Sequence, residues 1–207
     1  MSQFFAIHPE NPQARLIRRA ADIIRSGGII VYPTDSCYAL GCHIGDKAAM
    51  ERIRAIRGVD ARHHLTLVCR DLSELATYAK VDNSQFRLLK AATPGSYVFI
   101  LEATRELPKR LQHPKRRTIG LRIPDHPVVD ALLTELGEPI LSSTLLLPGD
   151  ELPHTDAAEI RERLEHQVEL VLDGGSCGIE PSTVVDLTGA APLLVRAGKG
   201  MLAPLGL

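Results

Sequence analysis

The sequence lacks several features that mark common classes of protein. It has no tryptophan, and aromatic residues make up 4% of its 207 residues, so a platform on which single-stranded nucleic acid stacks is not indicated. No apolar run reaches the length needed to cross a membrane. The start of the chain has neither a basic stretch nor a long apolar core, so we expect no signal peptide and a cytoplasmic protein.

The cysteines are few and are not spaced for metal binding. They are Cys37, Cys42, Cys69 and Cys177. They form no Cys-x-x-Cys pair and have no paired histidine pattern, so no structural zinc site is expected and the thiols are predicted to be free. His63 and His64 are neighbours, and neighbouring side chains on a strand point to opposite sides. A structural or ligand-contacting role is therefore favoured for them, and no protein-bound metal is expected.

Common nucleotide-binding and hydrolase motifs are also missing. There is no Gly-x-x-x-x-Gly-Lys-Ser/Thr loop, no Gly-x-Gly-x-x-Gly after the first strand and no Gly-x-Ser-x-Gly elbow. The composition, 44% apolar and 24% charged, is that of a globular protein, and no internal repeat or dividing linker is present. Residues 1–207 are therefore expected to form a single domain.

Apolar periodicity predicts short helices that alternate with short strands. Strands are expected over residues 4–7, 29–32, 64–69, 97–101, 118–123, 140–144, 168–172, 183–187 and 193–196. Helices are expected from residue 11 or 12 to 26, over 46–57, 71–79, around 86–89, over 127–136 and from 155 or 156 to 165. This alternation predicts an α/β fold in which helices cover at least one face of a mixed sheet.

The stretch from Val31 to Cys42 combines a predicted buried strand with a polar loop. Pro33 ends the strand, because proline has no N–H to offer the neighbouring strand. Thr34, Asp35 and Ser36 follow at once. A hydroxyl- and carboxyl-bearing loop at a strand end is a common place to hold a small ligand, and an ordinary strand-to-loop turn is the alternative.

Hydroxyl and arginine side chains recur at the ends of other predicted strands. They are Thr34, Ser36, Arg122, Ser142, Ser143, Thr144, Ser182, Thr183 and Arg196. A guanidinium group is a planar fork of donors that suits carboxylate and phosphate, and hydroxyls add short donors to the same oxygens. If these strand ends converge, they form a site for an anion. Local structural ion pairs of Arg122 and Arg196 are the alternative.

The net charge of −1 hides a segregation of charge along the chain. Basic residues crowd between positions 105 and 122, whereas the balance between positions 150 and 173 is acidic. The candidate RNA-binding residues in the basic part are Lys109, Arg110, Lys115, Arg116 and Arg117. They predict a basic surface that could contact the phosphates of RNA, and a solvated basic loop is the alternative.

Taken in order, the motifs resemble those of the YrdC/YciO family. Residues 32–42, Tyr-Pro-Thr-Asp-Ser-Cys-Tyr-Ala-Leu-Gly-Cys, are similar to the family's Tyr-Pro-Thr-Asp-Thr-x-Tyr-Gly-Leu-Gly motif. The likeness continues at residues 56–58, 94–95, 122–124, 142–144, 182–186 and 196–198, and it is nearest to the YciO branch at residues 66–75 and 145–149. The resemblance implies an open, twisted sheet with a concave basic face.

The resemblance also implies a chemistry. Characterised members of the family are threonylcarbamoyl-AMP synthases, nucleotidyltransferases that join threonine, bicarbonate and ATP, release pyrophosphate and supply a modification of tRNA. Such catalysis rests on positioning and charge stabilisation, with Mg²⁺ bound to the triphosphate. ATP, threonine and bicarbonate are therefore the expected small-molecule partners, tRNA or double-stranded RNA a further one, and a monomer the expected state.

Roles for individual residues follow from the same resemblance. The catalytic residues would be Arg57 and Arg62, the substrate-binding residues Thr34, Tyr38, Thr66, Arg122 and Ser182, and the nucleotide-binding residues Ser142, Thr144, Thr183 and Arg196.

Two departures from the family pattern predict a weak or altered synthase. Arg57 stands where the family has the lysine of a Lys-x-Arg pair, and Val59 replaces the arginine; Arg62 is the candidate to replace it. The family's Ser-x-Asn motif ends here in Leu146. Removal of a charge-assisted hydrogen bond from a buried site costs about 2–4 kcal/mol. An RNA-binding protein without synthase activity and a module that binds a ligand without turnover are the alternatives.

Overall fold

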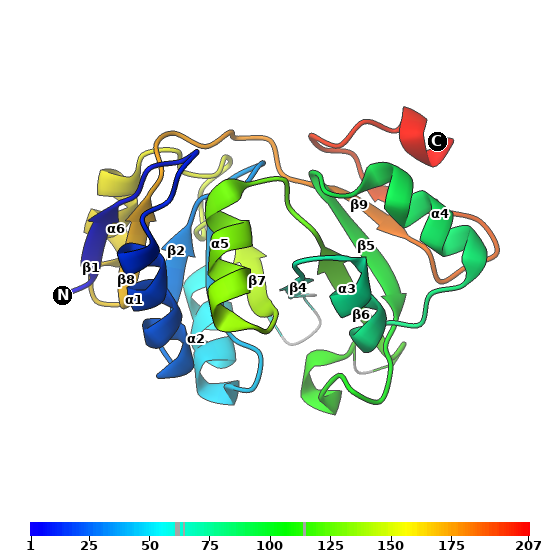
Figure 1. Ribbon diagram of the computed structural model, residues 1–207, viewed down its shortest axis with the longest axis horizontal. Coiled ribbons are helices and arrows are strands. Elements are labelled where there is room, and N and C mark those ends of the chain that lie inside the picture. Colours follow the sequence, from blue (N-terminus) through cyan, green and yellow to red (C-terminus); the bar gives the residue numbers. More distant parts are fainter. Residues whose placement is uncertain (61–62, 64, 114) are drawn as a thin grey trace.

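The computed structural model describes residues 1–60, 63, 65–113 and 115–207, and these form one mixed sheet with helices packed against it (Figure 1). The strands are β1 (Gln3–Ala6), β2 (Ile30–Tyr32), β3 (Ala39–His43), β4 (Thr66–Val68), β5 (Tyr97–Glu102), β6 (Thr118–Arg122), β7 (Ile140–Thr144), β8 (Leu170–Asp173), β9 (Thr183–Asp186) and β10 (Leu193–Arg196). The α-helices are α1 (Ala14–Arg25), α2 (Lys47–Arg57), α3 (Leu72–Tyr78), α4 (Asn83–Ala92), α5 (Pro127–Leu136) and α6 (Ala157–Leu164). Two short 3₁₀ turns, η1 (Lys109–Leu111) and η2 (Ala203–Leu205), complete the described elements.

The sheet is open and mixed. Its strand order is β1-β8-β2-β3-β7-β4-β6-β5-β9-β10, with parallel pairs such as β4–β6 and antiparallel pairs such as β3–β7. β1 and β10 lie at opposite edges, and the two chain termini lie towards opposite ends of the molecule (Figure 1). The predicted single-domain α/β fold with a mixed sheet is therefore confirmed.

Alternation of side chains along the strands builds the core on both faces of the sheet. In the half that holds β1 to β3, Ile30 and Tyr32 pack with α1 and α5, whereas Ile29 and Val31 pack with α2 and α6. In the other half, Phe99 packs in one core with residues of α3 and α4. The neighbouring residues of β5 point to the other face, where they line a cleft. One face of this half is thus left for a ligand.

β3 is absent from the strands predicted from the sequence. No strand is predicted between residues 33 and 63, but Ala39–His43 pairs with β2 on one side and with β7 on the other. Alanine and glycine disfavour strands in isolation, so burial in the middle of the sheet decides this segment. The polar stretch 33–38 is consequently the connection of a β-hairpin, held at both ends.

Helix ends are set by local chemistry that the sequence predicts well. The carboxylates of Asp46 and Asp71 accept hydrogen bonds from the backbone N–H groups of Ala49 and Glu74, as expected for N-caps. Gly137 ends α5 with φ 71°, which favours glycine. A further capping box, Asp82 with Gln85, begins α4.

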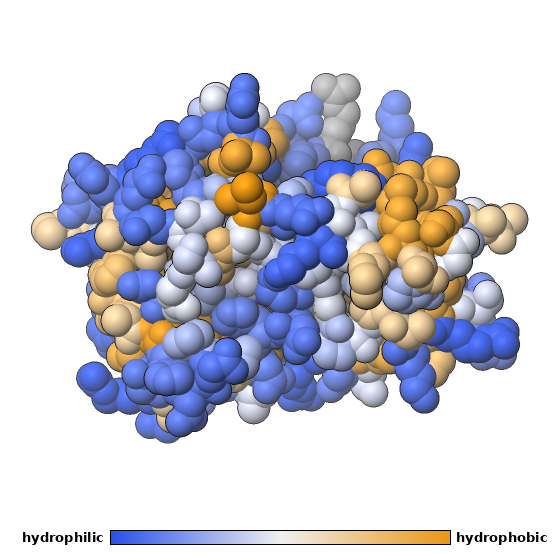
Figure 2. All heavy atoms as spheres, turned by 90° about the horizontal axis from the view of Figure 1, so that it is seen from above, coloured by the Kyte–Doolittle hydropathy of each residue, from blue (hydrophilic) through white to orange (hydrophobic). Residues whose placement is uncertain are grey.

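The face of the molecule seen from above is mainly hydrophilic (Figure 2). Seen from above, exposed apolar residues gather in separate groups, the largest towards the right-hand end of the view, and hydrophilic residues lie between them (Figure 2). In the described residues, no helix combines the length and the apolar character that crossing a membrane requires.

Candidate functional site

A cleft of about 390 Å³ lies where the end of α2 faces the sheet. Its polar lining includes Arg57, His63, Thr66, Ser143, Thr144 and Arg196. Its apolar lining includes Val98, Ile100, Leu146, Leu152, Ile179, Val184 and Val195. The lining of the cleft therefore combines cations and hydroxyls with aliphatic side chains.

Arg57 reaches the cleft because α2 ends at that residue. Gly58 follows in a left-handed conformation, φ 62°, and its N–H and that of Val59 bond back to the carbonyl groups of Ala55 and Arg54. The Nε of Arg57 donates to the Oγ of Ser143 at 3.1 Å. The end of the helix and one hydroxyl thus fix the direction of the guanidinium group.

Arg196 is the last residue of β10, which forms one edge of the sheet. Its Nε and Nη2 donate to the carbonyl oxygen of Ser182, at 3.3 and 2.8 Å. Gly198, two residues later, lies so close to the Pro181 carbonyl that a Cβ would stand 2.1 Å from the oxygen. The glycine of the Arg196-x-Gly198 motif is therefore required by this close approach.

The two arginines carry positive charge with no acidic partner. Within the described part of the chain, neither guanidinium makes an ion pair. Burial and the nearby charge of Arg196 lower the pKa of Arg57, and burial also lowers the pKa of Arg196. Burial, then the charges of Arg57 and Arg196, lower the pKa of His63, which keeps its imidazole neutral. The wall is thus electrostatically prepared for an anion.

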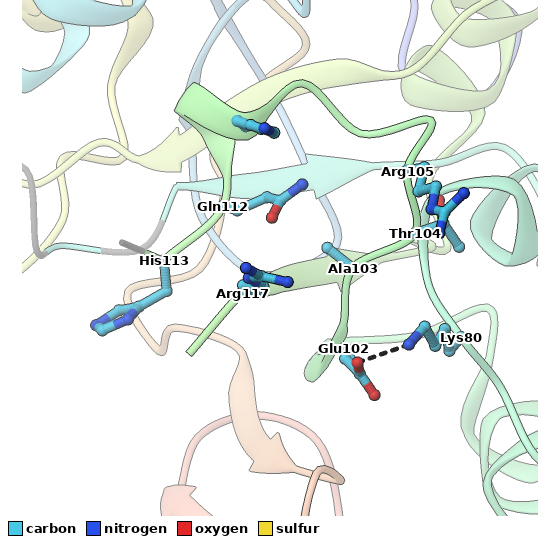
Figure 3. Close-up of a pocket in the computed structure, with 9 residues that line it drawn as sticks. Lys80, Glu102, Ala103, Thr104, Arg105, Gln112, His113 and Arg117 are labelled. Atoms are coloured by element: carbon cyan, nitrogen blue, oxygen red, sulfur yellow. Dashed lines mark hydrogen bonds and ion pairs between the residues drawn. The ribbon is translucent and has the colours of Figure 1, made fainter. Parts of the chain in front are cut away.

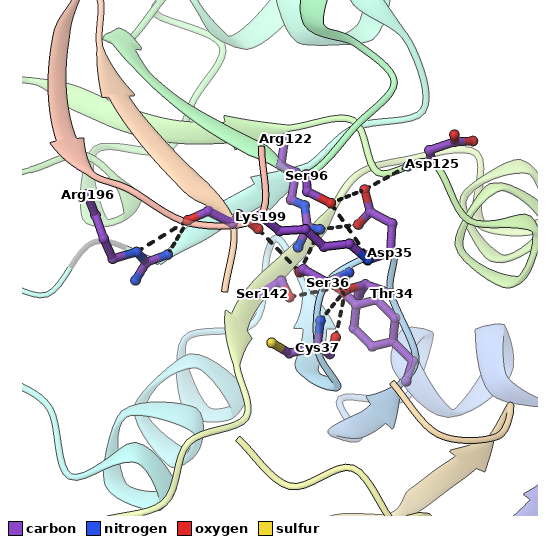
Figure 4. Close-up of polar contacts among 12 residues, drawn as sticks. Thr34, Asp35, Ser36, Cys37, Ser96, Arg122, Asp125, Ser142, Arg196 and Lys199 are labelled. Carbon is purple, nitrogen blue, oxygen red and sulfur yellow. Dashed lines mark hydrogen bonds and ion pairs between the residues drawn. The ribbon is translucent and has the colours of Figure 1, made fainter. Parts of the chain in front are cut away.

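Arg122 lies in a different environment, although it was predicted to bind a ligand in the same way. Its Nη2 makes an ion pair with Oδ1 of Asp35 and donates to Oγ of Ser36 at 2.9 Å (Figure 4). The other oxygen of Asp35 accepts from Oγ of Ser96 at 3.0 Å and from the N–H of Asp125 at 3.2 Å. Both side chains of the ion pair are about nine-tenths buried. Arg122 is therefore neutralised inside the protein.

The hydroxyl groups of the 33–38 hairpin continue this network. Thr34 donates to the carbonyl of Cys37 at 2.6 Å and lies 3.2 Å from Oγ of Ser36. Ser36 in turn lies 3.3 Å from Oγ of Ser182 (Figure 4). The carbonyl oxygen of Ser182 is the one that holds Arg196. The hairpin loop and the cleft are thus linked through one chain of polar contacts.

The remaining predicted hydroxyls have partners inside the protein. Tyr32 donates to Oγ of Ser142 at 2.7 Å, and Ser142 donates to the Leu40 carbonyl at 2.9 Å. Tyr38 donates to the Gly175 carbonyl at 2.6 Å, and burial raises the pKa of its phenol. Thr183 donates to the Gly200 carbonyl at 2.7 Å. These groups shape the walls of the site from behind.

The structure therefore divides the predicted site residues. Arg57, Thr66, Thr144 and Arg196 line the cleft together; Thr34, Arg122 and Ser182 belong to the adjoining network; and Tyr38, Ser142 and Thr183 bond within the protein. Arg62 and His64 lie outside the described residues.

The predicted RNA-binding residues are also divided. Lys109 and Arg117 line a separate pocket, Arg110 donates to the Gly45 carbonyl at 2.6 Å, and Arg116 lies 3.8 Å from the carboxylate of Asp186. Lys115 is exposed. The five residues thus do not present one continuous row of free cations.

Three residues of the site region have no assigned role among the predicted site residues. Asp35 was predicted only as part of a polar loop, although its partner Arg122 follows 87 positions later. Ser143, predicted as one of the strand-end hydroxyls, and His63, for which a structural or ligand-contacting role was favoured, line the cleft with Arg57. The signal for Asp35 was present, because a buried arginine at one strand end needs a carboxylate nearby.

Metal and thiol chemistry do not stand out at the site. The described residues contain no cluster of three or more histidine, cysteine or acidic side chains placed to hold a metal. Burial raises the pKa of every cysteine, to about 12 for Cys42 and to about 11 for Cys177. These thiols are therefore protonated at neutral pH and are poor nucleophiles.

Comparison with known proteins agrees with the fold and with the motifs. The Sua5/YciO/YrdC family model, described as "Telomere recombination", matches residues 22–198. The crystal structure of Escherichia coli YciO is 57% identical in sequence and has a TM-score of 0.96, over 99% of this chain and 100% of that chain.

More distant relatives carry a named activity or ligand. A threonylcarbamoyl-AMP synthase of Chromobacterium violaceum is 31% identical over 182 residues, which cover 86% of this chain and 92% of that protein. The structure of Pyrococcus abyssi Sua5 complexed with L-threonine has a TM-score of 0.87 and 28% identity, over 95% of this chain and 58% of that chain.

Proposed function

Because the chain belongs to the Sua5/YciO/YrdC family, we propose that its cleft carries out adenylate-forming chemistry of the threonylcarbamoyl-AMP synthase type, in a role related to tRNA modification. The substrates would be threonine, bicarbonate and ATP, and the products threonylcarbamoyl-AMP, pyrophosphate and water. The observation that carries the proposal is the pair Arg57 and Arg196, two cations in one cleft that make no ion pair within the described residues.

The cationic and the aliphatic lining residues suit the two ends of a nucleotide. Guanidinium groups bind phosphate oxygens with two parallel hydrogen bonds. The aliphatic side chains of Val98, Ile100 and Val184 offer an apolar surface for a base. We therefore place the phosphates against Arg57 and Arg196, and the base against β5 and β9.

The amino-acid end would lie towards the 33–38 hairpin. Hydroxyls of Thr66, Ser143 and Thr144 face the cleft there, and the hydroxyl chain from Thr34 to Ser182 supports Arg196 from behind. Thr34 and Ser182 would thus act by holding the wall in position. Tyr38 would support the site in the same way, through the hydrogen bond from its hydroxyl to the Gly175 carbonyl.

The chemistry needs no covalent intermediate with the protein. The threonine nitrogen adds to the carbon of bicarbonate, and loss of water leaves a carbamate. A carbamate oxygen then attacks the α-phosphorus of ATP, and the bond to pyrophosphate breaks. Neutral His63 lines the cleft and would accept a proton from the threonine ammonium group, while the arginines would stabilise the charge that develops on phosphate.

Mg²⁺ fits this site as a companion of the nucleotide. Among the described residues that line the cleft, Glu151 is the acidic one. A single carboxylate together with substrate phosphates is a usual environment for Mg²⁺, which keeps several waters. Glu151 would therefore hold the ion, which would neutralise triphosphate charge when bound.

Leu146 argues for a reduced rate. It lines the cleft at the position where the family has an amide, so it offers no hydrogen bond to a nucleotide. Val59 is half-buried beside the end of α2 and offers no charge. We therefore propose a weak or altered synthase rather than an efficient one.

The proposal is tested by pyrophosphate release from ATP that depends on both threonine and bicarbonate. Wild type is compared with Arg57→Ala and with Arg87→Ala, a matched loss of charge on the exposed face of α4. We expect release by wild type and by Arg87→Ala, and a fall of about 30- to 1000-fold for Arg57→Ala. Wild-type release no greater than that of Arg57→Ala would exclude synthase activity.

A second candidate is an RNA-binding protein without this activity, favoured by the exposed Lys115 and Arg116 on the β5–β6 connection. Because phosphate contacts release counterions, affinity for a structured RNA should fall steeply with salt. Replacement of both residues by glutamate should weaken binding further. Affinity that changes neither with salt nor with this charge reversal would exclude it.

A further inference from the structure

The connection between β5 and β6 forms a second pocket, with no lining residue in common with the cleft. It encloses about 690 Å³ (Figure 3). Its charged lining residues are Lys80, Glu102, Arg105, Lys109 and Arg117, and its other described lining residues are Ala103, Thr104, Gln112 and His113. Its volume lies within the range of small-molecule sites, about 300–1,000 Å³.

Positive charge dominates this pocket. Glu102 is its acidic residue among those described, and it pairs with Lys80 at 2.7 Å (Figure 3). In the described part of the chain, Arg105, Lys109 and Arg117 make no ion pair. Three cations without acidic partners around one hollow repel one another, and a concave shape focuses their field on an anion.

The walls of the pocket are built structures rather than a loose loop. Leu107 and Leu111 anchor the connection in the main core, and Gln112 donates to the Leu107 carbonyl at 2.9 Å. Arg110 ties η1 to the Gly45 carbonyl. The cations are therefore carried on a supported frame, which lowers the entropy lost on binding.

Arg117 adds an independent observation. It has φ 54°, a left-handed conformation that is uncommon for a residue with a side chain. Its N–H donates to the His113 carbonyl at 3.0 Å, and its carbonyl accepts from the N–H of Ala103 at 2.9 Å. The surrounding hydrogen bonds thus hold a strained backbone that presents this arginine to the pocket.

The chemistry of the lining selects the kind of anion. The neutral donors have partners already, because the hydroxyl of Thr104 donates to the Thr77 carbonyl at 2.6 Å and the amide of Gln112 to that of Leu107. No phenylalanine or tyrosine lines the described part of the pocket, so the imidazole of His113 is the one aromatic ring among the described lining residues and the stacking surface for a nucleobase is small. We propose that this pocket is a second, separate site that binds a compact inorganic oligophosphate.

Calorimetric titration of the full chain with inorganic tripolyphosphate tests this site. The pocket variant is Arg105→Gln with Lys109→Gln, and the matched control is Lys115→Gln with Arg116→Gln, which removes two charges from the same connection outside the pocket. A cleft variant, Arg57→Gln, separates this site from the proposed synthase site. Unfolding midpoints of all variants check that each remains folded.

We expect the pocket variant to bind tripolyphosphate at least about tenfold more weakly than wild type, because two charge-assisted hydrogen bonds to the anion are removed. The control and Arg57→Gln should both keep the binding event of this pocket at near wild-type affinity, whether or not tripolyphosphate also enters the cleft. Equal weakening in the pocket variant and the control would show non-specific attraction and overturn the proposal. Loss confined to Arg57→Gln would place the phosphate in the cleft, and tighter binding of a structured RNA than of tripolyphosphate, lost in the control variant, would assign the region to RNA.

Discussion

Arg122 and Arg196 were both predicted to hold an anion at a strand end, and Arg57 was predicted to be catalytic, yet the structure gives Arg122 surroundings opposite to those of the other two. Arg122 is buried against the carboxylate of Asp35, with Ser36 as a further partner. Arg57 and Arg196 face a cleft and bond to a hydroxyl and to a carbonyl oxygen, which leave their charge uncompensated. Whether an arginine forms a structural ion pair or part of a binding site therefore depends on whether an acidic side chain lies beside it.

This difference predicts different costs of substitution. A buried charge that loses its partner destabilises the fold, because the free-energy cost of removing that charge from water is no longer offset. A charge that faces a cleft with a like charge beside it contributes little to stability and much to anion binding.

The largest effect is expected from Asp35→Asn, which leaves Arg122 buried without a carboxylate. We expect the free energy of unfolding, measured by urea denaturation, to fall by about 3–5 kcal/mol. The double variant Asp35→Asn, Arg122→Met should recover much of that loss, because no unpaired charge remains. A loss below about 1 kcal/mol for Asp35→Asn would place this ion pair among weak surface pairs and contradict the comparison.

Next in size is Arg57→Met, which keeps the length of the side chain but removes its charge. The rate of pyrophosphate release should fall, because the transition state loses about 2–4 kcal/mol of stabilisation. The free energy of unfolding should change by less than about 1 kcal/mol, because Arg57 makes no ion pair with any residue that the structure describes. If Arg57→Met unfolded as readily as Asp35→Asn, the two arginine environments would not differ as described.

A smaller effect of opposite sign is expected from Leu146→Asn. The amide would place a hydrogen-bond donor and acceptor in the cleft where an apolar side chain now lies. One such bond is worth about 0.5–1.5 kcal/mol, so affinity for ATP should rise by roughly two- to tenfold. Leu152→Asn, which also changes a residue of the cleft lining, is the matched control. An equal gain in ATP affinity from Leu152→Asn would show that added polarity, and not the position of the amide, raises the affinity.

The smallest effect concerns His63 and pH. Burial and the two arginines hold its pKa below the usual value in the folded protein. The unfolded chain therefore binds more protons as pH falls below about 6.5, and stability decreases in that direction and is restored above it. Between neutral and mildly acidic pH, the unfolding midpoint of His63→Gln should therefore fall less than that of wild type. Burial also lowers the pKa of His126, so His126 contributes to the same loss of stability at acidic pH. If the pH dependence of the unfolding midpoint were unchanged in His63→Gln, none of the decrease would be due to His63.

The sequence predicted most of the fold because hydrophobic periodicity and helix caps are local signals. The helix that ends at Gly58 and the strand that ends at Arg122 appear within a residue or two of their predicted bounds. β3 escaped prediction because alanine and glycine carry no strand signal, and the strand exists through its neighbours β2 and β7.

The site was predictable in its residue types but not in its arrangement. A motif places Arg57 and Arg196 near a ligand, and both do line the cleft. It cannot show that Asp35 neutralises Arg122, or that Tyr38 and Thr183 direct their hydroxyls to backbone carbonyls. Such pairings join segments far apart in sequence and depend on the twist of the sheet.

The central claim is that Arg57 and Arg196 form an anion site that Arg122 does not share. Calorimetric titration with ATP and Mg²⁺ of wild type, Arg57→Met and the exposed control Arg87→Met tests it most directly. We predict affinity at least about tenfold weaker for Arg57→Met and within about twofold of wild type for Arg87→Met. Wild-type affinity in Arg57→Met would contradict the claim.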